Sequence, residues 1–313
     1  MKHERTIAYI AFATVCLVWG TTYLFIRIAI ETIPPVLLTG ARFSVAGLIM
    51  LAIGLARGER IPRDRTTLLN LAFVGLLLIG IGNLSVVWAE QWVPSGLAAL
   101  FVATAPFWAA MLELLRKNGE RLSLRGGIGM LIGFLGVAML VTPRGSGGRL
   151  DTHFLLGAVA IQIGSLGWQY GTIRGKYHVK NVPPLTSAAL QALTGGIVMD
   201  VIGFAIGEGS RFTLTPRTFG ALAYLTIFGS VIAYSAYFFA LAHIRTTKMS
   251  LYAYVNPVVA VILGWLVLGE TLTRVSVLAM CVILAGVALV QTAGLRRKPA
   301  AVPEPAAAEK TAA

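Results

Sequence analysis

The chain has 313 residues, of which 57% are hydrophobic and only 12% are charged, with 26 Lys and Arg against 13 Asp and Glu. Soluble domains carry about 25% charged residues, so a water-soluble globular protein is excluded. A mean hydropathy of +0.78 instead indicates an integral membrane protein.

Ten apolar stretches follow one another along the chain, separated by short segments that hold most of the Pro, Gly and charged residues. Each is close to the roughly 20 residues that a helix needs to cross the hydrocarbon of a bilayer. Lipid cannot hydrogen-bond an open backbone, so helices are the expected spans. The predicted spans are 7–26, 36–56, 67–89, 96–115, 124–142, 154–172, 185–207, 218–241, 249–268 and 275–292.

The positive charge lies mostly on one side of these spans. Nineteen of the 26 Lys and Arg residues fall on the side of the N-terminus, five fall on the other side, and Arg27 and Arg42 lie within spans. Because positive charge stays cytoplasmic, both termini are expected inside the cell. The basicity is therefore a topology signal, and nucleic acid is not an expected partner.

The chain contains an internal sequence repeat. Trp19 precedes Pro34 by 15 residues, and Trp168 precedes Pro183 by the same 15 residues. Other matching motifs lie 149 to 151 residues apart. Each half has an odd number of spans, so the second copy must be inverted in the membrane, an arrangement typical of secondary transporters.

The prediction is an all-α polytopic membrane protein of ten transmembrane helices in two inverted five-helix repeats. The first repeat covers residues 7–143 and the second covers residues 153–293. Residues 294–313 are rich in Ala and Pro, which predicts a disordered cytoplasmic tail.

Signatures of catalysis are scarce. The four histidines have no metal-ligand spacing, and no glycine-rich phosphate-binding loop is present. We therefore expect no catalytic residues, no metal and no cofactor. Gly129 and Gly133 form a G-x-x-x-G pattern, which favours close helix packing over a ligand role.

Several motifs together resemble the EamA-domain drug/metabolite transporters, and within them the YedA-type exporters. They are WGTTY at 19–23, PP at 34–35, RF at 42–43, PSG at 94–96, YAYVNP at 252–257 and GETL at 269–272. The resemblance covers residues 7–293. It implies inner-membrane location, cytoplasmic termini and a central cavity lined by helices 1, 3, 4, 6, 8 and 9, but it does not transfer a substrate.

Pro106 and Pro257 occupy matching places near the middle of two predicted spans. Proline removes a helical hydrogen bond, and the freed carbonyl needs another partner at that depth. A substrate-facing break is favoured over a purely structural kink. Asn256 shares a helix face with Tyr252, and both interhelical bonding and substrate contact stay open for it.

Aromatic residues gather on the helices that the resemblance places around the cavity, although aromatic belts at the membrane interface are the alternative, especially for Trp88. A polar stripe on the sixth span adds further candidates. The predicted substrate-binding residues are Trp19, Tyr23, Asn83, Trp88, Pro106, Gln162, Ser165, Trp168, Tyr234, Tyr252, Asn256 and Pro257.

Glu90 and Asp200 are the candidates for proton coupling, because an intramembrane carboxylate is a functional hypothesis by default, although a structural role is favoured for each. Arg27 and Arg42 are expected to snorkel to the interface or to pair with Glu31.

The sequence thus predicts a secondary transporter that exports a small amphipathic metabolite, amino-acid-like or drug-like, by alternating access. A membrane-embedded transferase and a facilitative channel are the alternatives. The expected partners are the lipid bilayer and a small-molecule substrate, and the sequence does not specify the oligomeric state.

Overall fold

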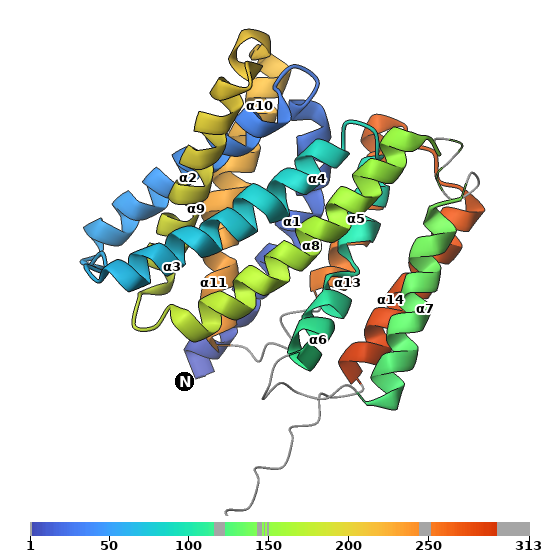
Figure 1. The fold of residues 1–313 in the computed structure, drawn as a ribbon, viewed down its shortest axis with the longest axis horizontal. Helices are drawn as coiled ribbons and strands as arrows, with labels where there is room; N and C mark the ends of the chain where they lie inside the picture. Colours follow the sequence, from blue (N-terminus) through green and yellow to red (C-terminus); the bar gives the residue numbers. More distant parts are fainter. Residues whose placement is uncertain are drawn as a thin grey trace, which may run out of the picture.

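The structure is a computed structural model that describes residues 2–115, 123–142, 146, 148, 150–243 and 252–292. All regular structure in these residues is helical, and they contain no β-strand (Figure 1). The predicted tail, residues 294–313, lies outside the described residues.

The described residues of the first half form five helical rods, two of which are interrupted. The third predicted span consists of two α-helices joined by the π-helical segment η1, and the fourth is broken by a turn at residues 103–104. The elements are α1 (Lys2–Ala29), α2 (Pro35–Ala56), α3 (Arg65–Gly75), η1 (Leu76–Asn83), α4 (Leu84–Ala89), α5 (Ser95–Val102), α6 (Ala105–Leu115) and α7 (Leu124–Leu140).

The described residues of the second half also contain a π-helical segment, η3, between two α-helices. A short 3₁₀ turn, η2, follows the second long helix. The elements are α8 (Thr152–His178), α9 (Pro184–Ala205), η2 (Glu208–Arg211), α10 (Pro216–Tyr224), η3 (Leu225–Ile232), α11 (Ala233–His243), α13 (Tyr252–Leu268) and α14 (Arg274–Thr292).

Local sequence explains where several helices begin. Proline at the first helical position opens α2 and α9, where a missing N–H is not needed. Asp64 caps α3 by accepting hydrogen bonds from Thr66 N and Thr67 N. The hydrogen bonds from Thr67 hold the pKa of the exposed Asp64 carboxyl below its usual range.

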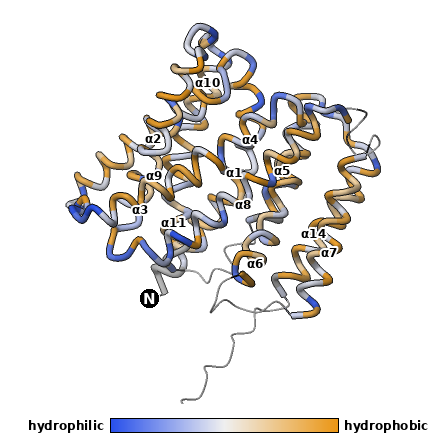
Figure 2. The backbone as a smooth tube through the Cα atoms, viewed as in Figure 1, coloured by the Kyte–Doolittle hydropathy of each residue, from blue (hydrophilic) through white to orange (hydrophobic). Residues whose placement is uncertain are grey.

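The helix bodies are apolar and the connections polar, as Figure 2 shows. Six described helical segments are long and apolar enough to cross a membrane, and three shorter apolar helices accompany them. Large apolar side chains also lie on the outer surface: Leu115 is 76% exposed and Phe204 is 67% exposed. Such a surface would be a liability in water but suits contact with lipid.

Each half contributes one partner to two close helix pairs, α2 with α9 and α7 with α14. Glycines make the second contact. A Cβ on Gly129 would lie 2.8 Å from Gly286 O, and a Cβ on Gly286 would lie 2.5 Å from Gly133 N. The packing role predicted for the G-x-x-x-G pattern is therefore confirmed.

Two glutamates cap helices of the opposite half. Glu208 Oε2 accepts from Leu37 N of α2 at 2.9 Å, and Glu59 Oε2 accepts from Thr186 N of α9 at 3.0 Å. Glu208 lies 149 residues after Glu59, and Thr186 lies 149 residues after Leu37. The two caps are thus equivalent contacts, each satisfying backbone donors that a helix start leaves free.

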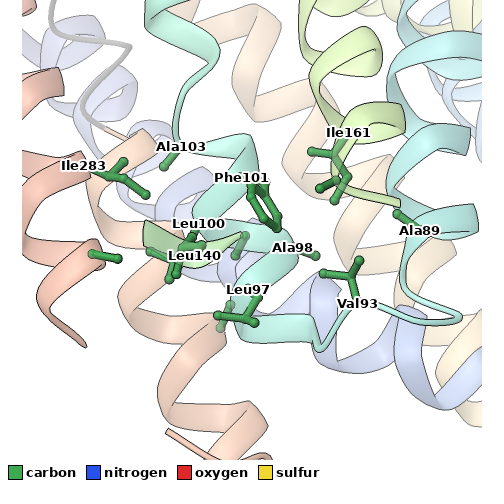
Figure 3. Packing of buried hydrophobic residues seen from close by; sticks show 14 of the residues in the cluster. Ala89, Val93, Leu97, Ala98, Leu100, Phe101, Ala103, Leu140, Ile161 and Ile283 are labelled. Atoms are coloured by element: carbon green, nitrogen blue, oxygen red, sulfur yellow. The ribbon is translucent and has the colours of Figure 1, made fainter. Parts of the chain in front are cut away.

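A large apolar cluster holds the broken fourth rod in place (Figure 3). Phe101 of α5 is fully buried and packs with Ile161 of α8, while Leu100 and Ile283 of α14 belong to the same cluster. The interrupted helix is therefore fixed between α8 and α14.

Candidate functional site

A cavity of about 100 Å³ lies where helices of both halves meet. Its wall is mostly aromatic and aliphatic, with a few polar groups, which is typical of small-molecule sites. The lining residues are Trp19, Thr22, Tyr23, Ile26, Arg42, Phe43, Gly82, Asn83, Val86, Val102, Ala105, Gly164, Ser165, Trp168, Gly229, Tyr234, Tyr252 and Asn256.

Trp19 is the centre of the aromatic wall. Its ring centroid lies 5.9 Å from that of Trp168 in an edge-to-face arrangement, and 5.4 Å from that of Tyr252. Tyr237 completes this group at 5.1 Å. Tyr234 extends the wall with its ring 6.4 Å from Trp168. Because edge-to-face rings fix one another's orientation, the wall is preorganised.

The π-helical segments η1 and η3 both reach the cavity, and they occupy positions 149 residues apart. In η3, Gly229 O accepts a hydrogen bond from Trp19 Nε1 at 3.2 Å. A π-helical turn displaces backbone groups from their usual pairing, and such turns are frequent at functional sites. Sequence periodicity gave no signal for either segment.

Arg42 is buried in the cavity wall and is only 3% exposed. Its Nε donates to Ser230 Oγ at 2.7 Å, and its guanidinium lies 4.7 Å from the centroid of the Phe43 ring. Glu31 pairs instead with Arg217 at 3.3 Å on the surface. The expectation that Arg42 snorkels or pairs with Glu31 was therefore wrong, because α2 turns this side chain inward.

Eight of the twelve predicted binding residues line the cavity. They are Trp19, Tyr23, Asn83, Ser165, Trp168, Tyr234, Tyr252 and Asn256. Asn256, with its amide oriented to satisfy its neighbours, also donates to Cys16 O at 2.9 Å and to Tyr252 O at 3.2 Å. Asn256 thus joins α13 to α1 while it lines the cavity.

The other four residues lie elsewhere. Trp88 packs on Trp92, with ring centroids 4.7 Å apart, and Trp92 stacks on His153. Pro106 is the second residue of α6, just after the break in the rod, whereas Pro257 lies inside the continuous helix α13. The two matched prolines therefore have different local structures.

The side chain of Gln162 forms hydrogen bonds with residues on both sides of the break between α5 and α6. Its Oε1 accepts from Thr104 Oγ1 at 2.8 Å and from Trp108 Nε1 at 2.9 Å, and its Nε2 donates to Phe101 O at 3.1 Å. A carbonyl left free at membrane depth needs such a partner. The observed contacts of Gln162 are thus structural.

Glu90 is fully buried beside the cavity. Arg27 Nη1 donates to its backbone oxygen, and Arg27, Arg42 and Glu270 interact electrostatically with its carboxylate. Glu270 itself caps α5, accepting from Ser95 N at 2.7 Å and from Gly96 N at 3.0 Å. The charged residues therefore form one cluster.

Asp200 lies apart from this cluster. Its Oδ2 accepts from Ser44 Oγ at 2.6 Å, which joins α9 to α2 away from the cavity lining. Within the described ranges, no group of three His, Cys, Asp or Glu side chains could hold a metal ion.

These features define an all-helical integral membrane protein with an aromatic-lined cavity between its two halves. The model of the EamA-like transporter family matches residues 6–142 and again residues 155–292, so the chain belongs to the EamA-like transporter family.

Named relatives agree with this assignment. The inner membrane transporter YedA of Escherichia coli K12 is 40% identical over 277 residues, which is 88% of this chain and 87% of that protein. The transporter YvbV of Bacillus subtilis strain 168 is 25% identical over 311 residues, covering 96% of both chains. A crystal structure at 20% identity has the same fold, with a TM-score of 0.66 over 90% of this chain and 96% of that one.

Proposed function

We propose that this protein is a secondary transporter that exports a small amphipathic metabolite, amino-acid-like or drug-like, across the inner membrane by alternating access. The cavity carries the proposal, because its lining comes from both halves of the chain and combines aromatic walls with isolated polar groups. Transporters with inverted repeats bind substrate at the interface between their repeats.

The proposed architecture is ten transmembrane helices in two inverted repeats, residues 7–143 and 153–293. Three observations support it: the matched caps by Glu59 and Glu208, the matched π-helical segments, and the pairing of each of α2 and α7 with its counterpart. A pseudo-two-fold axis in the membrane plane would relate all three.

Flux measurements test the transport proposal. Purified protein in proteoliposomes, and inside-out vesicles from cells that express it, should accumulate amphipathic metabolites with saturable kinetics and competition between related compounds. Flux that rises linearly with concentration would instead support a facilitative channel. Chemical conversion of the compound without net movement would support a membrane-embedded transferase.

The topology gives a separate prediction. From the 19-to-5 distribution of Lys and Arg, both termini should be cytoplasmic. A reporter fused after Leu295 should give a cytoplasmic signal, and one fused after Gly147 should give an external signal. The reverse result at either site would contradict the proposed orientation.

Proton coupling, if transport is proton-driven, is proposed to reside in Glu90 rather than Asp200. The Glu90 carboxylate oxygens have no hydrogen-bond partner among the described residues, whereas the Asp200 carboxylate is held by Ser44. Protonation of Glu90 would alter its interactions with Arg27 and Arg42. An imposed pH gradient should therefore stimulate flux in the wild type and in Asp200→Asn.

Glu90→Gln keeps the shape of the side chain but cannot change charge. Its flux should no longer respond to the imposed gradient, while Asp200→Asn serves as the matched control. A full response in Glu90→Gln would remove Glu90 as the coupling group.

A further inference from the structure

Building on the proposed transport function, we infer that the substrate carries a single anionic group and that Arg42 binds this group at the cavity wall. The inference deepens the proposal by naming the charge of the substrate. It rests on the burial of Arg42, on its unused hydrogen-bonding capacity and on the aromatic groups of the cavity wall.

Arg42 is a buried cation whose bonding is incomplete. Its Nε donates to Ser230 Oγ, but its buried Nη1 has no hydrogen-bond partner among the described residues. No carboxylate in the described part of the chain forms an ion pair with it. Glu90 interacts with Arg42 electrostatically but makes no ion-pair contact with it. A charge inside a membrane protein is expensive unless its hydrogen-bonding groups are satisfied, so a guanidinium with an unused N–H group in a cavity wall indicates a site for an anion.

The surrounding charges limit the substrate to one negative charge. Glu90 and Glu270 are two acidic side chains in the same cluster as Arg27 and Arg42, and of these four residues Arg42 lines the cavity. A dianion would therefore meet one cation and a nearby carboxylate. A monoanion such as a carboxylate matches the charge of Arg42, and a guanidinium favours the planar geometry of a carboxylate.

The other residues that line the cavity indicate which further chemical groups the substrate carries. Asn83 lines the same cavity, and its Oδ1 lacks a partner within the described residues, so this oxygen could accept from an N–H or O–H group of a substrate. Trp168 and Tyr234 supply an aromatic wall for an apolar body. The fitting compound is thus an aromatic or aliphatic monoanion with one hydrogen-bond donor.

The second half of the chain provides a matched comparison. Gln191 lies 149 residues after Arg42, at the equivalent place in α9. It is buried, and its Nε2 donates to Ser187 Oγ at 2.9 Å. The chain therefore tolerates a buried neutral amide at this position of the repeat, which makes Arg42→Gln a suitable variant.

The test measures binding to purified full-length protein by calorimetry, with probes of one shape and different charge. The probes are 3-phenylpropionate, its neutral amide 3-phenylpropionamide, the cation 3-phenylpropylamine and the zwitterion phenylalanine. Wild-type protein should bind the two carboxylates at least about tenfold more tightly than the amide or the amine, a difference of about 1.4 kcal/mol.

The variants then assign this preference to Arg42. Arg42→Gln should bind the carboxylate and the amide equally, Arg42→Lys should retain part of the preference, and Arg63→Ala on the surface should leave it unchanged. If Arg42→Gln does not fold, the wild-type preference and the Arg42→Lys result decide.

The outcomes separate the two proposals. Equal binding of carboxylate and amide by the wild type, or an unchanged preference in folded Arg42→Gln, would overturn the anion inference and leave transport intact. Absence of binding and of vesicle flux for all four probes would count against the proposed amphipathic substrate, and against this inference with it.

Discussion

Gly129→Leu should destabilise the protein by about 1–3 kcal/mol, because the new side chain has no room where α7 crosses α14. A Cβ at this position would already lie 2.8 Å from Gly286 O and 2.9 Å from Val290 N, and both are backbone atoms that a rotamer change cannot move. The two helices would have to separate. Thermal unfolding of detergent-solubilised protein, followed by size-exclusion chromatography, measures the loss.

Gly127→Leu is the matched control on the same helix. A Cβ at Gly127 would have nothing within 4 Å, and neither glycine has a positive φ. Both substitutions gain the same helix propensity, so the difference between them isolates the packing contact. Equal stability of the two variants would mean that α7 and α14 are not packed as described.

The sequence predicted the helical character of the chain well, because its apolar stretches carry a local physical signal. Trp19 and Trp168 were both predicted to bind substrate, and in the structure both line the cavity with their ring centroids 5.9 Å apart. Pro35 and Pro184 open equivalent helices. The length of an apolar stretch and the position of a proline determine where a helix forms and begins. Both are properties of the local sequence, so helices can be predicted from them without knowing the tertiary structure.

The direction in which a polar side chain points was less predictable. Gln162 and Ser165 belong to one polar stripe of α8, yet Ser165 lines the cavity while Gln162 completes the bonding of a broken neighbouring rod. Arg42 was assigned to the interface, and it is buried. The spacing of residues along a helix predicts which side chains share a face. Which other element that face contacts is determined by tertiary packing.

The interruptions of the helices were predicted only in part, since a break was expected at both Pro106 and Pro257. Pro106 follows a break and Pro257 lies inside a continuous helix, although the two prolines occupy corresponding positions in the two halves of the sequence. In the π-helical segment η3, Gly229 O accepts a hydrogen bond from Trp19 Nε1, which lies 210 positions away in the sequence. A contact between residues so far apart cannot be predicted from the periodicity of the local sequence.

Trp168→Ala is expected to weaken substrate binding by on the order of tenfold, about 1.4 kcal/mol. The substitution removes a ring that lines the cavity and that holds Trp19 and Tyr234 in edge-to-face contact. Aromatic anchors of this kind carry a large share of binding energy. Trp168→Phe, which keeps a ring, should lose less.

Asn256→Ala should weaken binding as well, with some loss of stability, because its amide also joins α13 to α1 through Cys16 O. Trp265→Ala is the matched control, since this tryptophan lies on the same helix α13 and is 56% exposed on its outer face. It should bind substrate as the wild type does, and so should Arg63→Ala. If Trp168→Ala and Asn256→Ala are folded by size-exclusion chromatography and bind a transported compound with wild-type affinity, the substrate site lies outside this cavity.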